Sequence, residues 1–210
     1  MTSLFLSGPA GRLEAEIKRS PGATTAAVVC HPHPQYGGTL YNKIVYRAAR
    51  AIHGAGITTL RFNFRGVEAS EGHFDGGRGE VDDARAALDF LGEEHDRLIV
   101  AGYSFGSWVG LRAGIADPRV KALIGIGLPI DVFDFSFLRD ARVPLLIVHG
   151  DKDGWGESDK VRALAGELSS PVALEIIPGA DHFFEAHHLE TMMGKISDFL
   201  AREAEQLLVD

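Results

Sequence analysis

A serine set between two glycines is the strongest chemical signal in the sequence. Gly102-Tyr103-Ser104-Phe105-Gly106 follows an apolar run that ends at Ala101 and precedes a segment, 107–116, that can form a helix. A sharp strand-to-helix turn strains the serine backbone and crowds both neighbours, so a Cβ at either glycine would clash. The pattern predicts that the Ser104 hydroxyl projects above a sheet at a helix N-terminus, where developing negative charge is favoured. A simple serine N-cap is the alternative interpretation.

A serine hydroxyl becomes a good nucleophile only when a base removes its proton. Nine histidines are available. Functional residues of parallel α/β sheets lie just past the carboxyl ends of strands, which favours His182, five residues beyond an apolar run that ends at Ile177. We therefore predict that His182 is the base, although a loop histidine beside an acidic neighbour, Asp181, would look the same.

Two aspartates after another apolar run can orient the imidazole and stabilise its cation. Asp153 precedes a glycine and can turn inward, whereas Asp151 lies nearer the strand and is suited to accept backbone N–H bonds of the turn. We predict Asp153 as the acid, with Asp151 as the fallback. The chain order Ser104, Asp153, His182 is that of α/β-hydrolases and differs from the trypsin and subtilisin orders.

Acyl transfer also requires two N–H donors for the oxygen of the tetrahedral intermediate. One is expected to be the backbone N–H of Phe105, which follows the nucleophile. The other is expected from the loop 31–38, where proline at positions 32 and 34 has no N–H to give. His33, between those two rigid prolines, is the best candidate, and Gln35 remains possible.

The same loop raises the question of a metal. His31 and His33 lie two residues apart, but no third ligand follows at a recognisable zinc spacing, so no metal is predicted. Cys30 is the single cysteine of the chain and falls in an apolar run. It is expected to be an inert core residue. A single cysteine also excludes disulfide bonds within the chain.

The elements that must position these residues alternate along the chain. An N-terminal hairpin is predicted from 3–7 and 12–19 around a turn at 8–11. Six further strands are predicted at 26–30, 58–64, 98–101, 122–126, 144–148 and 173–177. Helices are predicted at about 41–54, 80–95, 106–116, 157–169 and 187–206. This alternation predicts a three-layer α/β/α sandwich, with a mostly parallel sheet and an antiparallel hairpin, as one domain over 1–210.

Composition limits the partners. The chain has 210 residues, 45% of them hydrophobic and 24% charged, with a formal net charge of −8. An acidic chain repels phosphate backbones and anionic lipid, which makes nucleic acid and membrane surfaces poor partners. No apolar run reaches the ~18 residues of a membrane span, and the first residues do not read as a secretory signal. We expect a cytoplasmic protein, a monomer or homodimer, that needs no cofactor.

Several motifs together resemble the α/β-hydrolase superfamily, in particular its small, capless bacterial branch related to dienelactone hydrolases. They extend over about residues 5 to 200: His31-Pro32-His33-Pro34, Gly37-Gly38-Thr39, Asn42-Lys43, Arg61-Phe62-Asn63-Phe64-Arg65-Gly66, Ser70-Glu71-Gly72, Phe74-Asp75, Gly79-Glu80, Asp82-Asp83, Gly102-Tyr103-Ser104-Phe105-Gly106, His149-Gly150-Asp151-Lys152-Asp153 and Asp181-His182-Phe183-Phe184. The resemblance implies Ser104 as nucleophile, Asp153 as acid and His182 as base, with the oxyanion loop at His33.

Two positions depart from that resemblance. Dienelactone hydrolases carry cysteine where this chain has Ser104, so their lactone substrate is not transferred. Position 68 is glutamate, where relatives commonly have glycine.

The predicted function is a serine hydrolase of short-chain or accessible carboxylic esters that acts through an acyl-enzyme. Only residues 129–143 are available where larger relatives insert a lid, which predicts an open site. Aromatic side chains are candidates for an apolar acyl pocket, although core packing is the alternative for each: Tyr36, Phe135, Trp155 and Phe183, and further Phe133, Phe137 and Phe184. A peptidase, an acyltransferase and a non-catalytic binding protein remain alternatives on the same fold.

Overall fold

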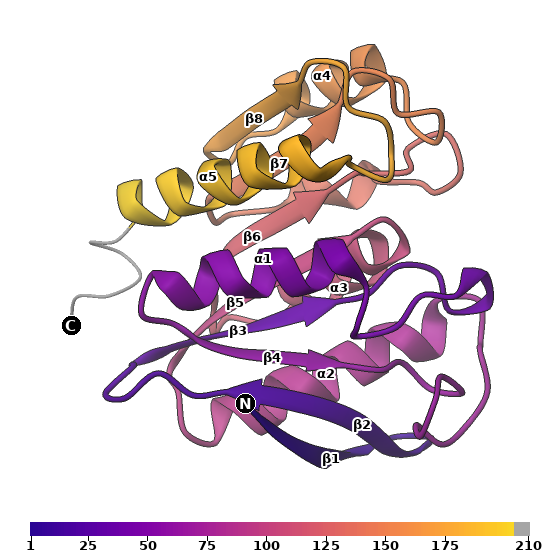
Figure 1. Ribbon diagram of the computed structural model, residues 1–210, viewed down its shortest axis with the longest axis vertical. Coiled ribbons are helices and arrows are strands. Elements are labelled where there is room, and N and C mark those ends of the chain that lie inside the picture. The colour runs from indigo at the N-terminus through magenta and orange to yellow at the C-terminus, as the bar shows by residue number, and fades with distance from the viewer. Residues whose placement is uncertain (204–210) are drawn as a thin grey trace.

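The sheet is mostly parallel, with an antiparallel hairpin at one edge (Figure 1). A computed structural model describes residues 1–203. Within them one eight-stranded sheet has the order β1-β2-β4-β3-β5-β6-β7-β8, and only the β1–β2 and β2–β4 pairs are antiparallel. The strands are β1 Thr2–Gly8, β2 Gly11–Lys18, β3 Thr25–Cys30, β4 Thr58–Phe62, β5 Arg97–Tyr103, β6 Val120–Ile126, β7 Leu145–Gly150 and β8 Val172–Ile177. The predicted fold class is confirmed.

Helices cover both faces of the sheet. They are α1 Lys43–Gly54, α2 Arg78–Gly92, α3 Phe105–Ile115, α4 Ser158–Glu167 and α5 Ala186–Arg202, with 3₁₀ turns at η1 Pro34–Tyr36 and η2 Ser136–Asp140. Helices α1 and α5 bury their apolar sides on one face, and α2, α3 and α4 on the other. The helix predicted over 187–206 ends at Arg202 in the structure, and positions 204–206 lie outside the described residues.

Burial explains why the predicted strands form. Every residue of β3 and β4 is buried, as expected for parallel strands covered on both faces. In β2, by contrast, burial alternates: Leu13, Ala15 and Ile17 are buried in the core, and the charged residues between them, Glu14 and Glu16, are only partly buried on the opposite face. The hairpin therefore has a single fully buried face.

One strand is shorter than predicted. The sequence predicts a strand over 58–64, but β4 ends at Phe62. The Asn63 N–H donates to the carbonyl of Glu14 on β2, and the Phe64 N–H donates to the His31 ring, so the chain turns away from β3 at this point. A side chain, the His31 ring, here takes the N–H that a continued strand ladder would use.

The carboxyl edge of the parallel strands carries the loops that hold the predicted site residues. The loop after β3 contains His33, the turn after β5 contains Ser104, and the loops after β7 and β8 contain Asp153 and His182. Between β6 and β7 the chain forms η2 and no inserted domain, so this edge has no cap. Convergence of strand ends at one edge thus brings together residues that are far apart in sequence.

Candidate active site

Ser104 occupies a strained turn between β5 and α3. Its backbone has φ 55° and ψ −124°, a region that side-chain-bearing residues rarely adopt. A Cβ on Gly102 would lie 2.2 Å from the Gly106 carbonyl oxygen, and a Cβ on Gly106 would lie 2.4 Å from the Cys30 carbonyl oxygen. Both glycines are therefore required by close backbone approach. The Ser104 side chain makes no capping bond to α3, which rules out the alternative of a simple N-cap.

A hydrogen-bonded chain links Ser104 to His182 and Asp153. His182 Nε2 lies 2.9 Å from Ser104 Oγ, and His182 Nδ1 lies 2.7 Å from Asp153 Oδ2. Asp153 and His182 are buried, and the second carboxylate oxygen, Oδ1, accepts the N–H of Trp155. Because a carboxylate only accepts, Nδ1 carries the imidazole proton and Nε2 is free to accept the proton of the hydroxyl.

The two candidate aspartates have different partners. Asp151 is exposed, and its Oδ1 accepts the N–H of Gly179 at 2.6 Å, which ties the loop after β7 to the loop after β8. It makes no contact with His182 in the described part of the chain. The structure thus brings Asp153, and not the fallback Asp151, to the imidazole.

The candidate oxyanion donors border the same cavity as Ser104. His33 is held by its own loop: its carbonyl accepts the N–H groups of Tyr36 and Gly38, and its ring Nδ1 accepts the N–H of Gln35. The amide of Gln35 is thereby occupied, which leaves His33 as the better candidate. Within residues 1–203, neither the His33 nor the Phe105 amide donates to another residue. Two uncommitted N–H groups beside a nucleophile are suited to stabilise an oxyanion.

The cavity above Ser104 has a volume of about 510 Å³ and a predominantly apolar lining. The lining includes Ser104 and His182 and, among the predicted pocket residues, Tyr36, Phe133, Trp155 and Phe183. A volume of this size is typical of small-molecule sites.

Three predicted pocket residues lie elsewhere, and Phe135 is the main correction. Phe135 is 1% exposed, belongs to the hydrophobic core and stacks on Phe137. Its exposed neighbours Asp134 and Ser136 hydrogen-bond to each other. Phe184 belongs to the core between the sheet and helices α1 and α5. Phe135, Phe137 and Phe184 therefore pack in or against the hydrophobic core, as the alternative interpretation predicts.

Comparison with known proteins identifies the family. Residues 36–206 match the family described as an alpha/beta hydrolase domain. The chain belongs to this family. An uncharacterized protein of Rickettsia prowazekii is 38% identical over 213 residues, covering 95% of this chain and 89% of that protein.

Solved structures of other alpha/beta hydrolases superpose over nearly the whole chain. A protein of unknown function from Agrobacterium tumefaciens has a TM-score of 0.92 at 37% identity, covering 100% of this chain and 99% of that one. A serine hydrolase without a lid from Xanthomonas campestris has a TM-score of 0.88 at 35% identity, covering 100% of this chain and 96% of that one. The resemblance to α/β-hydrolases is confirmed.

Two further residues of this alpha/beta hydrolase lie beside His182 and Asp153. The hydroxyl of Tyr103, the second residue of the serine motif, donates to the His182 carbonyl at 2.9 Å. His149 Nε2–H donates to the carbonyl of Gly156 at 2.8 Å and lies 3.8 Å from Asp153 Oδ2. Sequence reasoning missed both roles. The only available signal was their position inside the motifs that contain Ser104 and Asp153.

His31 ties the start of the loop 31–38 to the turn after β4. It is fully buried: Nδ1–H donates to the carbonyl of Pro32 at 2.6 Å, and Nε2 accepts the N–H of Phe64 at 3.0 Å. Burial lowers the pKa of His31 to about 4, so the ring is neutral at neutral pH. Both nitrogens are occupied, which leaves neither for a metal.

Across residues 1–203, no three His, Cys, Asp or Glu side chains cluster as metal ligands would. None of the helices in that range combines the length and apolarity needed to cross a membrane. Cys30 is buried, and burial raises the pKa of its thiol.

Proposed function

We propose that the protein hydrolyses carboxylic esters, with Ser104 as nucleophile, His182 as general base and acid, and Asp153 as the residue that orients the imidazole. The continuous chain of two hydrogen bonds from Asp153 through His182 to Ser104 carries the proposal. Membership in a hydrolase family supports the same chemistry.

The proposed reaction has two steps. Ser104 Oγ attacks the ester carbonyl while its proton moves to His182 Nε2, and the resulting oxyanion is bound by the N–H groups of Phe105 and His33. The C–O bond to the leaving group breaks as His182 returns the proton to the departing oxygen. Water then attacks the acyl-enzyme with His182 as base, which releases the acid and restores Ser104.

The shape of the site supports small or accessible acyl groups. The cavity of about 510 Å³ is lined by exposed side chains such as Trp155 and Phe183, and the chain between β6 and β7 adds no lid over it. A long acyl chain would extend past these residues into water and gain little further apolar contact. We therefore expect short esters, or esters presented on a larger accessible molecule, to be the better substrates.

Hydrolysis of p-nitrophenyl acetate, butyrate and octanoate tests the proposal. We expect Ser104→Ala to lower kcat/KM by about 10³-fold or more. Ser3→Ala, on the exposed outer strand β1, is the matched control and should keep full activity. A fluorophosphonate probe should label the wild type and the control but not Ser104→Ala. Equal hydrolysis by wild type and Ser104→Ala would refute the assignment.

A further inference from the structure

The cavity above Ser104 is electrically neutral. Among the residues that line it within the described part of the chain, none is lysine, arginine, aspartate or glutamate. Two of its ionisable side chains are held uncharged: burial lowers the pKa of His33 and raises the pKa of the Tyr103 hydroxyl. A carboxylate that entered this cavity would lose water without gaining a cationic partner.

Two lysines near the cavity along the chain are engaged with other groups, whereas Lys152, close before the lining residue Trp155, is exposed and does not line the cavity. Lys43 follows the lining residue Asn42, and its Nζ donates to the carbonyl of Phe184 at 3.0 Å. Lys160, from α4, pairs with Asp131, the neighbour of the lining residue Val132. Recruiting either ammonium to a substrate would break an existing contact.

The negative charges around the site oppose an anionic substrate as well. The carboxylate of Asp153 lies directly behind His182, on the far side of the imidazole from Ser104. The whole chain carries a formal net charge of −8, which repels an approaching anion. Both effects are absent for an uncharged ester.

The mouth of the cavity consists of exposed apolar side chains. The exposed fraction is 80% for Tyr36, 53% for Val132, 45% for Trp155 and 60% for Phe183. All four line the cavity, so this apolar surface is concentrated where a substrate enters. Exposed apolar side chains gathered at one place mark a surface that binds apolar groups.

From these observations we infer that the site selects uncharged esters and rejects esters whose acyl group bears a carboxylate. This selectivity rests on the proposed function, since it concerns substrates of the same serine. The inference specifies the substrate class further: a neutral ester with an apolar group next to the scissile carbonyl.

A matched pair of substrates tests the inference. Mono-p-nitrophenyl adipate carries a free carboxylate, and its methyl ester has the same chain and leaving group without the charge. We expect kcat/KM to be about 30-fold or more higher for the methyl ester. Raising the salt concentration should reduce this ratio only slightly, because local desolvation is not screened as surface charges are.

A substitution at the mouth provides a gain-of-function test. Val132→Arg places a cation at the cavity, and Val132→Gln is the control of similar length without charge. We expect Val132→Arg to lower the ratio of neutral to anionic kcat/KM by about tenfold or more relative to Val132→Gln. Because the measured quantity is a ratio, a general loss of activity in both variants does not affect it.

The possible failures are distinguishable. If both adipates are hydrolysed at equal rates and both activities disappear in Ser104→Ala, charge selection is refuted and the serine hydrolase proposal stands. A preference for the anionic ester would likewise refute the inference. If neither adipate nor any of the simple p-nitrophenyl esters is cleaved, the proposed function itself fails, and the inference fails with it.

Discussion

The His182 imidazole has both ring nitrogens engaged, and its backbone is held as well. Asp153 accepts from Nδ1, the Ser104 hydroxyl faces Nε2, and the Tyr103 hydroxyl donates to the His182 carbonyl. A general base must keep its distance to the nucleophile within hydrogen-bond range. We therefore expect Tyr103 to position the proposed base, His182.

Tyr103→Phe tests this positioning role. The change removes one hydrogen bond and keeps the ring, so we expect kcat to fall by about three- to tenfold while KM changes little. Steady-state kinetics with p-nitrophenyl butyrate measures both constants. Tyr46→Phe on α1 is the control and should leave both unchanged. An unaltered kcat in a correctly folded Tyr103→Phe variant would show that the hydroxyl does not position His182.

Residue types and their spacing along the chain predict some residues of this site but not the residues that support them. Asp153 was preferred over Asp151 because it precedes a glycine and lies further from the strand, and the structure brings it to His182. Tyr103 could not be assigned in this way, because its partner lies 79 residues away in the sequence and is a backbone carbonyl. The prediction that Phe135 lines the pocket is wrong, because no sequence pattern distinguishes a loop aromatic residue that lines a pocket from one that packs in the core.

The turn after β4 contains a residue in an unfavourable backbone conformation. Glu68 has φ 48°, the left-handed region that favours glycine, in a turn where the Val67 N–H donates to Phe64 and the Ser70 N–H donates to Val67. The resemblance described from the sequence implies glycine at this position. The departure noted in the sequence thus corresponds to local backbone strain.

We expect Glu68→Gly to stabilise the fold. Relief of the strained conformation should raise the free energy of unfolding by about 0.5 to 1 kcal/mol, measured by urea denaturation. Ala69→Gly is the neighbouring control: Ala69 is not among the residues with positive φ, so added unfolded-state entropy should destabilise that variant. Destabilisation by both substitutions to a similar extent would contradict the strain assigned to Glu68.

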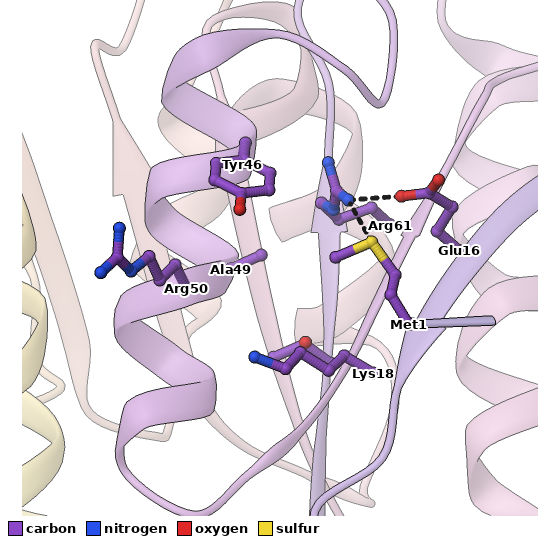
Figure 2. Close-up of a pocket in the computed structure, with 8 residues that line it drawn as sticks. Met1, Glu16, Lys18, Tyr46, Ala49, Arg50 and Arg61 are labelled. Carbon is purple, nitrogen blue, oxygen red and sulfur yellow. Dashed lines mark hydrogen bonds and ion pairs between the residues drawn. The ribbon is translucent and has the colours of Figure 1, made fainter. Parts of the chain in front are cut away.

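The hairpin is joined to the parallel sheet through a buried ion pair. Figure 2 shows the Arg61 guanidinium of β4 reaching the Glu16 carboxylate of β2 and the sulfur of Met1, at a small cavity of about 90 Å³. The side chains are only 4% and 13% exposed, and Arg61 also donates to the Leu40 carbonyl. Removal of the carboxylate would leave a buried cation without its counter-charge.

Glu16→Ala should therefore destabilise the fold strongly. We expect a loss of about 3 kcal/mol in the free energy of unfolding, measured by urea denaturation. Glu190→Ala breaks the more exposed pair with Arg47 and serves as the comparison, with an expected loss of about 0 to 1 kcal/mol. Equal losses in the two variants would show that burial does not distinguish the pairs.

For the molecule as a whole, alternating apolar runs and helical segments predict the fold class, a mostly parallel sheet with helices on both faces, but they do not give the order of the strands within the sheet. The rule that functional residues follow the carboxyl ends of parallel strands predicts Ser104, Asp153 and His182 at one edge of the sheet. The contacts of His31 and His149 were not predictable, since each bonds to a backbone group that no sequence pattern identifies, His31 to the Phe64 N–H and His149 to the Gly156 carbonyl. Their burial nevertheless affects the stability of the whole fold.

Buried neutral His31 predicts acid sensitivity. Its pKa falls from an ordinary 6.5 to about 4 in the folded protein, so the unfolded chain binds more protons between these values. The stabilising contribution is complete above pH 6.5 and is lost as the pH falls towards 4. Burial lowers the pKa of His149 too, which acts in the same direction.

His31→Gln removes the titrating group and keeps hydrogen-bonding atoms. Between pH 7 and pH 4.5, the wild type should lose about 2 to 3 kcal/mol more unfolding free energy than the variant. Urea denaturation at the two pH values measures the difference, and His149 remains in both proteins. Parallel stability curves for wild type and His31→Gln would contradict the assignment.

The two tryptophans of the chain lie in different surroundings. Trp155 is 45% exposed at the mouth of the cavity, with its ring centroid 6.0 Å from that of His182. Trp108 instead stacks on Phe133, with ring centroids 4.5 Å apart, beneath the guanidinium of Arg112. The mouth thus contains an intrinsic fluorophore whose emission will shift when a ligand displaces water from it. Ligand binding to an inactive Ser104→Ala enzyme can therefore be followed by tryptophan fluorescence, without a dye or a chromogenic leaving group. Trp155→Phe would abolish this fluorescence signal.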